Sequence, residues 1–191
     1  IIRPLITSLT AEKIDGIYGI VNGTTNYILT KMEKEGSKFE DVLKEAQDLG
    51  YAERNPDADI KGIDAQRKIA ILSDIAWGLK IDPNLVPTRG IDFVTQDIID
   101  KAASINCVIK LICYAKKIDD RICIFVSPCA INKNSVIANI NGVFNGVVFS
   151  CDYADDILLS GRGAGSNPTA SAVVSDIAQA YILSPRKKPL W

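Results

Sequence analysis

The sequence predicts an α+β domain with helices packed on one face of a mixed, largely antiparallel sheet. Its first half holds capping residues followed by apolar residues at helical spacing, whereas its second half holds apolar runs rich in β-branched residues and separated by turns. Helices that precede strands in this way indicate a sheet covered on one side. With 191 residues, 47% of them hydrophobic, residues 1–191 are expected to fold around one core as a single domain.

The first expected element is a strand at Ile14–Val21, where apolar residues surround two glycines. A helix is expected from Thr24, because Thr24 or Thr25 can accept a hydrogen bond from the free amides of its first turn. Gly36 is a natural C-terminal stop for this helix. The strand is therefore expected to pass almost directly into the helix.

Two more helices are expected before residue 80. Ser37 stands three residues before Glu40, which is the spacing of a capping box, and Gly50 closes the helix that this box would open. A polar loop at Tyr51–Lys61 then leads to a third helix at Gly62–Leu79, which ends before a proline.

The second half is expected to contain one helix, four strands and a closing helix. The helix is Gln96–Ser104, and the strands are Cys107–Ala115, Ile122–Val126, Gly142–Ser150 and Asp156–Ser160. The first two strands are expected to form a hairpin around the charged turn at Asp119 and Asp120. Pro168 favours the first turn of a closing helix that runs to about Leu183.

Charge and composition exclude several classes of protein. The 22 basic and 23 acidic residues give a net charge of −1 without a basic patch for a phosphate backbone, so we expect no nucleic-acid partner. The basic run Arg186–Lys188 is expected to be a solvated tail. Every apolar run is far shorter than the roughly 20 residues of a membrane-spanning helix, so we expect no membrane partner. The lack of histidine excludes Ser-His-Asp catalysis and imidazole metal ligands.

The five cysteines are odd in number, lack a C-x-x-C pair and lie mostly in apolar, strand-like runs. They are Cys107, Cys113, Cys123, Cys129 and Cys151. We expect them to be reduced core residues of a cytoplasmic protein, with no metal bound. A disulfide or zinc framework is the alternative, although zinc sites usually use closely spaced pairs of ligands.

The segment that carries chemistry is residues 50–68, which concentrates acidic residues before and at the start of a helix. Asp64 and Lys68 are four residues apart and share one helical face, which Ile71 and Ile75 continue as an apolar stripe. A polar pair that leads into such a stripe is expected to face the interior or a cleft. A lysine held there beside a carboxylate can donate a proton to an oxygen that becomes an alkoxide.

A simpler interpretation of the same spacing stays open. Asp64 and Lys68 can form an ordinary exposed ion pair, which would be worth only ~0.3–0.5 kcal/mol. Glu53 and Asp59 can likewise be acidic residues that the positive end of a helix dipole favours. Spacing alone favours this interpretation.

Three longer motifs resemble those of homoserine dehydrogenases. Residues 50–68 match the family's pattern GYAE-x-x-P-x-x-D-x-x-G-x-D-A-x-x-K at every fixed position. Residues 19–29 resemble its strand-to-helix motif, and residues 163–176 resemble its C-terminal motif. The departure is at Arg54 and Asn55, where family members often have Pro-Asp, and it bears on the rigidity of the loop more than on its chemistry. The motifs stand in family order and span nearly the whole chain, which makes a chance match improbable.

The resemblance implies reversible, NAD(P)-dependent reduction of aspartate 4-semialdehyde to homoserine, a step of threonine, methionine and isoleucine biosynthesis. Lys68 would transfer the proton as hydride passes between cofactor and substrate, and Asp64 would orient Lys68 and the substrate hydroxyl. The implied substrate-binding residues are Glu53 at the α-ammonium group, Asp59 in support of it, the Tyr51 backbone and Thr24.

The glycine-rich stretch Gly161–Gly165 is not a dinucleotide-binding fingerprint, because no βαβ unit surrounds it, and as bare sequence it indicates a tight turn. The resemblance implies that Gly163, Ala164 and Gly165 contact the nicotinamide end of the cofactor. NAD(P) would be bound mainly by a domain that is absent from these 191 residues. The family's second catalytic lysine and its loop for a monovalent cation would both precede Ile1.

The chain is therefore expected to be a piece of a longer protein, since it opens on Ile1 and its single methionine, Met32, lies within an expected helix. The resemblance implies a homodimer paired through the sheet, and a piece that is inactive alone. Without a partner, the closing helix would expose an apolar face. That face consists of Val173, Val174, Ile177 and Tyr181.

Two other functions remain open at this point. One is the substrate domain of a different oxidoreductase of similar architecture. The other is a non-catalytic module for dimerisation or amino-acid sensing that kept the fold and lost the chemistry.

Overall fold

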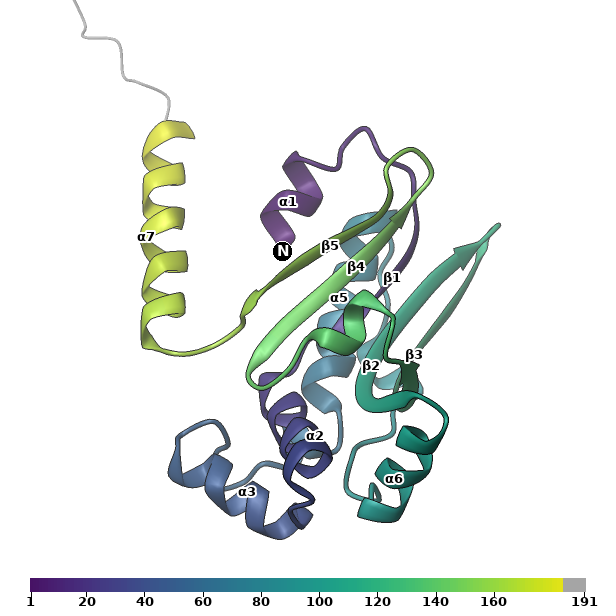
Figure 1. The fold of residues 1–191 in the computed structure, drawn as a ribbon. Coiled ribbons are helices and arrows are strands. Elements are labelled where there is room, and N and C mark those ends of the chain that lie inside the picture. The colour runs from purple at the N-terminus through teal and green to yellow at the C-terminus, as the bar shows by residue number, and fades with distance from the viewer. Residues whose placement is uncertain (184–191) are drawn as a thin grey trace, which may run out of the picture.

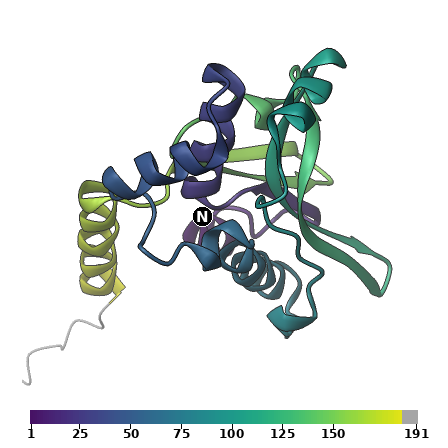
Figure 2. The same cartoon turned by 90° about the horizontal axis from the view of Figure 1, so that it is seen from below.

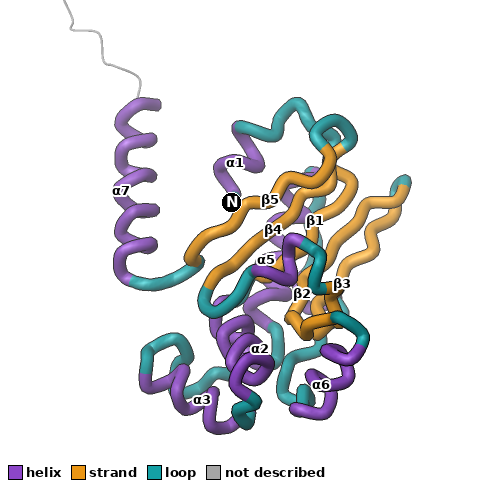
Figure 3. The backbone as a smooth tube through the Cα atoms, viewed as in Figure 1, coloured by secondary structure: helices purple, strands orange, loops and turns teal. Residues whose placement is uncertain are grey.

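A five-stranded antiparallel sheet forms the centre of the computed structural model, which describes residues 1–183 (Figures 1 and 3). The basic run near residue 187 lies outside the described residues. The order of the strands is β3-β2-β1-β4-β5. Their bounds are β1 Ile14–Ile20, β2 Cys107–Ile118, β3 Arg121–Asn132, β4 Phe144–Cys151 and β5 Asp155–Arg162. The predicted α+β class is confirmed. The sheet itself is antiparallel throughout, and the parallel pairing found among the described residues is one isolated bridge between Thr88 and Val126.

Seven α-helices and two 3-10 turns accompany the sheet within the described residues. The helices are α1 Ile2–Thr7, α2 Gly23–Glu35, α3 Phe39–Asp48, α4 Asp57–Ile60, α5 Ile63–Trp77, α6 Gln96–Ser104 and α7 Ser166–Leu183, and the turns are η1 Pro83–Leu85 and η2 Val136–Asn139. Helices α2 and α5 contact the central strands. None of the helices in this part of the chain is long and apolar enough to cross a membrane.

The main core lies between the sheet and helices α2 and α5. Ile17 of β1 and Phe149 of β4 are fully buried there, together with Ile28 of α2 and Ile69 of α5. Because successive residues of a strand point to opposite faces, the residues between them form a second cluster on the other face. That cluster contains Ile20, Ile112, Ile137, Ile140 and Val148.

The junction between β1 and α2 sits in a gap in the sheet. Strand β1 last pairs with β4 at Ile20, opposite Gly146, whereas β2 and β4 both continue further. The first turns of α2 lie beside this gap, where the side-chain amide of Asn26 donates to the carbonyls of Ile140 and Phe144 at 3.1 and 2.9 Å. The start of α2 is therefore fixed to the segment that leads into β4.

Lys110 of β2 holds the other side of the same gap, with only 1% of the residue exposed. Its Nζ donates to the side-chain oxygens of Asn26 and Asn141 at 3.1 and 2.9 Å and to the carbonyl of Ile140 at 2.8 Å. These acceptors use all three donors of the ammonium group, and all of them are neutral. Burial lowers the pKa of Lys110 to about 8.

Several expected boundaries are corrected by the structure. Asn22 rather than Thr24 or Thr25 caps α2, because its side chain accepts from the backbone N–H of Thr25 at 2.9 Å. The capping box at Ser37 does not form, since α3 begins at Phe39 and its N-cap residue, Lys38, makes no side-chain cap bond. The expected loop at residues 51–61 contains the short helix α4.

The hairpin is longer than expected, because β2 and β3 pair along their full lengths up to the two-residue turn. Asp119 in that turn adopts a left-handed φ of 54°, a conformation that Asp tolerates better than most residues. The closing helix begins at Ser166, two residues before Pro168. Proline is accommodated there because the first amides of a helix have no intrahelical acceptor.

Helix α7 lies to one side of the sheet in both views (Figures 1 and 2). Arg3 of α1 donates to the hydroxyl of Ser175 at 2.7 Å and pairs with the carboxylate of Asp176. The expected exposure of the apolar face of this helix is observed. Its residues Val173, Val174, Ile177 and Tyr181 are 54–85% exposed.

Candidate active site

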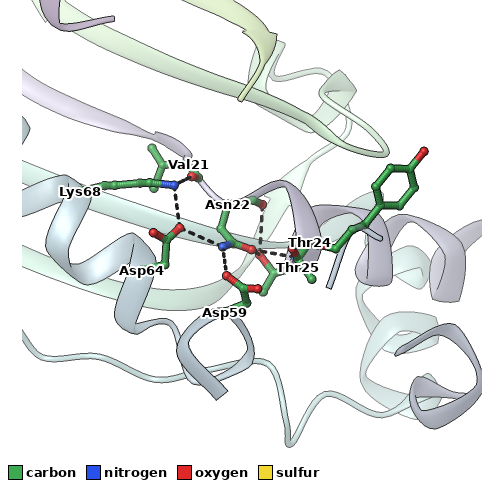
Figure 4. Close-up of polar contacts among 8 residues, drawn as sticks. Val21, Asn22, Thr24, Thr25, Asp59, Asp64 and Lys68 are labelled. Carbon is green, nitrogen blue, oxygen red and sulfur yellow. Dashed lines mark hydrogen bonds and ion pairs between the residues drawn. The ribbon is translucent and has the colours of Figure 1, made fainter. Parts of the chain in front are cut away.

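Asn22 joins the start of α2 to the two acidic residues of the α4–α5 segment (Figure 4). Its side-chain amide nitrogen donates to Asp59 Oδ1 at 2.7 Å and to Asp64 Oδ2 at 2.9 Å. Its side-chain oxygen accepts from the backbone N–H and the hydroxyl of Thr25, both at 2.9 Å. Because Asn22 is only 5% exposed, these bonds hold the two carboxylates at a defined place in front of α2.

Lys68 lies on the other side of Asp64. Its Nζ donates to Asp64 Oδ2 at 2.7 Å and to the backbone carbonyl of Val21 at 3.0 Å. The Asp64 side chain is 30% exposed and that of Lys68 is 46% exposed, so water and small ligands can reach the pair. An ammonium group has three donors, and the third finds no acceptor among the described residues. It is available to a bound molecule.

These groups line a cavity of about 400 Å³. Three parts of the chain form its walls: the β1–α2 junction, the segment from α3 to α5, and the strands β4 and β5 with the loop that leads to α7. The lining residues are Asn22, Gly23, Thr24, Leu49, Gly50, Tyr51, Asp59, Asp64, Lys68, Val143, Asn145, Arg162, Gly163, Ala164 and Gly165.

The structure brings most of the expected site residues together in this cavity. They are Thr24, Tyr51, Asp59, Asp64, Lys68, Gly163, Ala164 and Gly165. The Thr24 hydroxyl donates to the backbone carbonyl of Tyr51 at 2.7 Å, which ties the loop after α3 to the start of α2. Glu53 lies outside the cavity lining and is exposed, and its backbone carbonyl accepts from Gln47 at 3.1 Å.

Three lining residues with polar side chains, Asn22, Asn145 and Arg162, were not expected from the sequence. Asn22 could have been found from its position, because asparagine directly before a helix is a preferred cap. Asn145 and Arg162 carry no such signal, since they face the cavity through the pairing of β4 with β5. The guanidinium carbon of Arg162 lies 5.4 Å from the centre of the Phe144 ring, within range of a cation–π contact.

A second, mostly apolar cavity of about 220 Å³ adjoins the first. Its apolar walls come from Ile1, Ile2, Val21, Ile71 and Leu72. Lys68, Asn145 and Gly163 line both cavities. The boundary between a polar and an apolar space therefore runs along these three residues.

The arrangement can hold a small zwitterion and exchange a proton with it. Asp59 and Asp64 attract a cationic group, whereas the backbone N–H groups of Gly23 and Thr24 lack intrahelical acceptors and attract an anionic one. Lys68 can donate a proton to, or accept one from, an oxygen of the same ligand. Because Asp64 and Lys68 meet at a cavity and also bond to two other groups, the interpretation as an isolated surface ion pair is set aside.

The described residues contain no cluster of three or more metal-ligating side chains.

All five cysteines are free thiols. Only Cys113 among them is fully buried, and burial raises its pKa to about 12. Cys123 is exposed, so the expectation of five core cysteines is wrong for that residue. The reason is its place on β3, an edge strand with one open face.

Comparison with known proteins places this geometry in one family. The family model described as homoserine dehydrogenase matches residues 1–178. Homoserine dehydrogenases from Synechocystis sp. and Bacillus subtilis are 44% and 40% identical over 181 and 177 residues, each match covering 93% of this chain. The matches cover 42% and 41% of those relatives, so the chain spans about two fifths of their length.

Solved structures give the same result. A homoserine dehydrogenase from Thiobacillus denitrificans matches with a TM-score of 0.90 at 41% identity, over 98% of this chain and 44% of that one. A hyperthermophilic archaeal homoserine dehydrogenase mutant in complex with NADPH matches with a TM-score of 0.78 at 31% identity, over 98% of this chain and 54% of that one.

Proposed function

The chain belongs to the homoserine dehydrogenase family, and on that basis we propose that it forms the substrate-binding and proton-transfer part of an enzyme that interconverts aspartate 4-semialdehyde and homoserine. The observation that carries this proposal is the place of Lys68 in the cavity wall, held by Asp64 and by the carbonyl of Val21. The proposed activity is that of the whole enzyme, of which this chain would supply one side of the active site.

In the proposed reduction, hydride adds to the aldehyde carbon while Lys68 gives a proton to the carbonyl oxygen, so that the aldehyde becomes an alcohol and the lysine a neutral amine. In the reverse direction Lys68 takes the proton of the hydroxyl. Asp64 accepts a hydrogen bond from the ammonium group and holds its Nζ in place. The bond to Val21 restricts the position of the same atom.

The site fits the nicotinamide end of a cofactor. The apolar cavity next to Lys68 can take a flat ring, and Gly163 at the boundary places no side chain in the passage between the two cavities. NAD(P), when bound, supplies or accepts the hydride. We propose that Gly163, Ala164 and Gly165 contact it, and that the rest of the cofactor and any monovalent cation bind outside this chain.

Two carboxylates compete for the role of binding the substrate's α-ammonium group. Asp59 lies in the cavity and is held by Asn22, whereas Glu53 is exposed on the preceding loop. We propose that Asp59 makes the contact in the conformation seen here, and that Glu53 joins it when the loop folds inward over the substrate.

The role of Lys68 is tested by supplying a homoserine dehydrogenase cofactor domain in cis and measuring hydride transfer. Lys68→Met is expected to lower kcat by about 10²–10⁴-fold. Lys61→Met is the matched control, because Lys61 forms an i,i+4 ion pair with Asp57 at the same 2.7 Å but outside the cavity. Wild-type turnover in Lys68→Met would remove the basis of the proposal.

The substrate is tested with homoserine and with an analogue that lacks the α-amino group. Asp59→Asn and Glu53→Gln are each expected to weaken homoserine binding and to leave binding of the analogue unchanged. An effect on both ligands would favour a different oxidoreductase substrate.

A non-catalytic amino-acid-binding module is the second candidate, because residues of this chain alone already form a polar cavity. Such a module would bind homoserine, and a well-folded fusion of this chain with a cofactor domain would then show no turnover.

We also propose that two copies of the chain pair through the face of the sheet that α2 and α5 leave uncovered. The residues of β1, β2 and β3 on this face include Tyr18, Tyr114 and Phe125, which are all partly exposed. Tyr18 pairs with Tyr114 across β1 and β2, and Tyr114 pairs with Phe125 across β2 and β3. The result is an aromatic row that is continuous across three strands.

A further inference from the structure

The side chain of Asn145 of β4 lies between two glycines, Gly163 and Gly23, that belong to different segments. A Cβ atom placed on Gly163 would overlap the amide nitrogen of Asn145, and one placed on Gly23 would lie 3.6 Å from its oxygen. Gly163 belongs to the loop between β5 and α7, whereas Gly23 begins α2. The carboxamide of Asn145 therefore fills the space between the two segments, and a side chain at position 163 would displace it.

The side-chain oxygen of Asn145 is buried and finds no hydrogen-bond donor among residues 1–183. A buried amide oxygen without a donor is costly, so native structures seldom leave one unpaired unless a water or a ligand completes it. The two glycines beside it cannot offer side-chain donors. A water or a ligand at the site would supply the missing donor.

The place of this residue is informative because Asn145 lines both the polar and the apolar cavity, as do Lys68 and Gly163, so its buried oxygen lies next to them. Under the proposed function, the substrate occupies the polar cavity and the nicotinamide end of the cofactor the apolar one. The atoms that exchange hydride must then meet at this boundary. A fixed acceptor at the boundary can orient one of the two reactants relative to Lys68.

We propose that Asn145 is a positioning residue of the active site, whose side-chain oxygen accepts a hydrogen bond from a ligand at the boundary between the two cavities. This inference rests on the proposed function. The donor is an N–H or O–H group, and two reactants carry one there: the substrate through its hydroxyl, and nicotinamide through its primary carboxamide. Gly163 is required at its position because any side chain would displace the carboxamide of Asn145.

The test uses Asn145→Leu, which keeps about the same volume and removes the acceptor. Homoserine binding to the 191-residue chain is measured by calorimetry, and turnover is measured with a cofactor domain in cis. Losing one hydrogen bond is expected to weaken the affected step by about tenfold. Unchanged thermal stability of Asn145→Leu would show that the loss is not caused by unfolding.

The two sources of the donor give different results. If the substrate supplies it, Asn145→Leu weakens homoserine binding to the isolated chain. If nicotinamide supplies it, homoserine binding is unchanged and turnover falls, and a cofactor analogue with an acetyl group in place of the carboxamide turns over equally in wild type and variant. If neither binding nor turnover changes in Asn145→Leu, the proposal is overturned.

Gly163→Ala tests the same interaction from the side of the glycine. Because the new methyl group would displace the carboxamide, Gly163→Ala and Asn145→Leu should remove the same interaction, and the double variant should lose no more turnover than the worse single variant. Losses that multiply would show that the two residues act separately and would contradict the inference. If the wild-type fusion with a cofactor domain shows no turnover, the proposed function is contradicted. The inference on Asn145 can still be tested then, because homoserine binding and the stabilities of the variants are measured independently of turnover.

Discussion

At the scale of single residues, Asn22 combines two tasks that can be separated by substitution. It caps α2, and it also holds Asp59 and Asp64. Asn22→Ala removes both and is expected to lower the free energy of unfolding by about 1–2 kcal/mol, with weaker homoserine binding. Asn22→Ser is the matched control, because serine can cap a helix but is too short to reach the two carboxylates.

Denaturant unfolding and calorimetry check this prediction. Asn22→Ser should keep most of the stability and still bind homoserine less tightly than wild type. If Asn22→Ser binds as wild type does, the contacts of Asn22 with the acidic pair do not matter for the ligand.

Lys110 predicts an unusual dependence of stability on pH. Its pKa is about 8 in the folded protein, whereas that of an unfolded lysine is ~10.4. Between these values the unfolded state binds more protons, so this residue makes the folded state more stable as the pH rises. The ionisable groups that act on it are Glu33, which raises its pKa, and Lys34, which lowers it.

The effect of Lys110 is best measured as the difference in the free energy of unfolding between wild type and a variant, because Cys113 and Tyr18 lower the stability of both proteins as the pH rises. Burial raises both of their pKa values to about 12, which costs stability as they ionise in the unfolded state. The stability of wild type relative to Lys110→Met should increase by ~2 kcal/mol between about pH 7 and pH 10. The exposed Lys117 of the same strand supplies the control, since Lys117→Met should show no such trend.

The sequence predicts the chemistry of the site better than its geometry. The spacing of Asp64 and Lys68 places them on one helical face, and the structure shows them paired at the cavity. No local pattern distinguishes Glu53 from Asp59, because the position of each depends on how the loop after α3 folds. Asn145 is equally hidden, since its place next to Gly163 results from the pairing of two strands.

At the scale of elements, α4 is the part that most needs tertiary support. It has four residues, including Asp59, and it would not be stable alone. Gly90 passes directly behind it, where the backbone N–H of Ile91 donates to the carbonyl of Ile60 at 2.8 Å. A Cβ atom on Gly90 would overlap that same carbonyl. The close approach of the two backbones therefore sets the position of Asp59.

Gly90→Ala is expected to push α4 outward, with a loss of ~1–3 kcal/mol in the free energy of unfolding and weaker homoserine binding. Gly78→Ala is the control, because it strains the backbone without a steric overlap: the φ of Gly78 is +65°, and no atom lies within 4 Å of the added carbon. It should cost stability without a change in binding. Equal effects of the two substitutions on binding, measured by calorimetry, would show that Gly90 does not position α4.

The long elements could be predicted from the sequence, and the short ones could not. Helices α2 and α5 span several turns, so their apolar periodicity and their glycine stops are visible in the sequence. Helix α4 has four residues, about one turn, which is too short for an apolar periodicity to repeat. The capping box at Ser37 fails for a related reason, because the correct residue types at the correct spacing do not fix where a helix begins.

At the scale of the whole molecule, the two faces of the sheet differ in how they are covered. Helices α2 and α5 cover one face, whereas the other carries η2 and a small cluster of apolar residues. In register across the strands, the open face presents Tyr18, Tyr114 and Phe125 on β1, β2 and β3, whereas Val148 of β4 is already buried within that cluster. A partly exposed row of aromatic side chains that is continuous over three strands is the kind of surface that a stable protein interface buries.

We therefore expect the chain to sediment as a dimer and Phe125→Glu to sediment as a monomer, because a charge at this row would be buried without a partner in the interface. Phe125 lies on the edge strand β3 and is partly exposed in the single chain, so the substitution should leave the fold intact. Leu85→Glu is the control for an exposed apolar residue elsewhere, since Leu85 is 78% exposed on η1, and this variant should remain dimeric. A dimer that survives Phe125→Glu but dissociates on substitution of Val173 or Ile177 would place the interface on α7 instead of on the sheet.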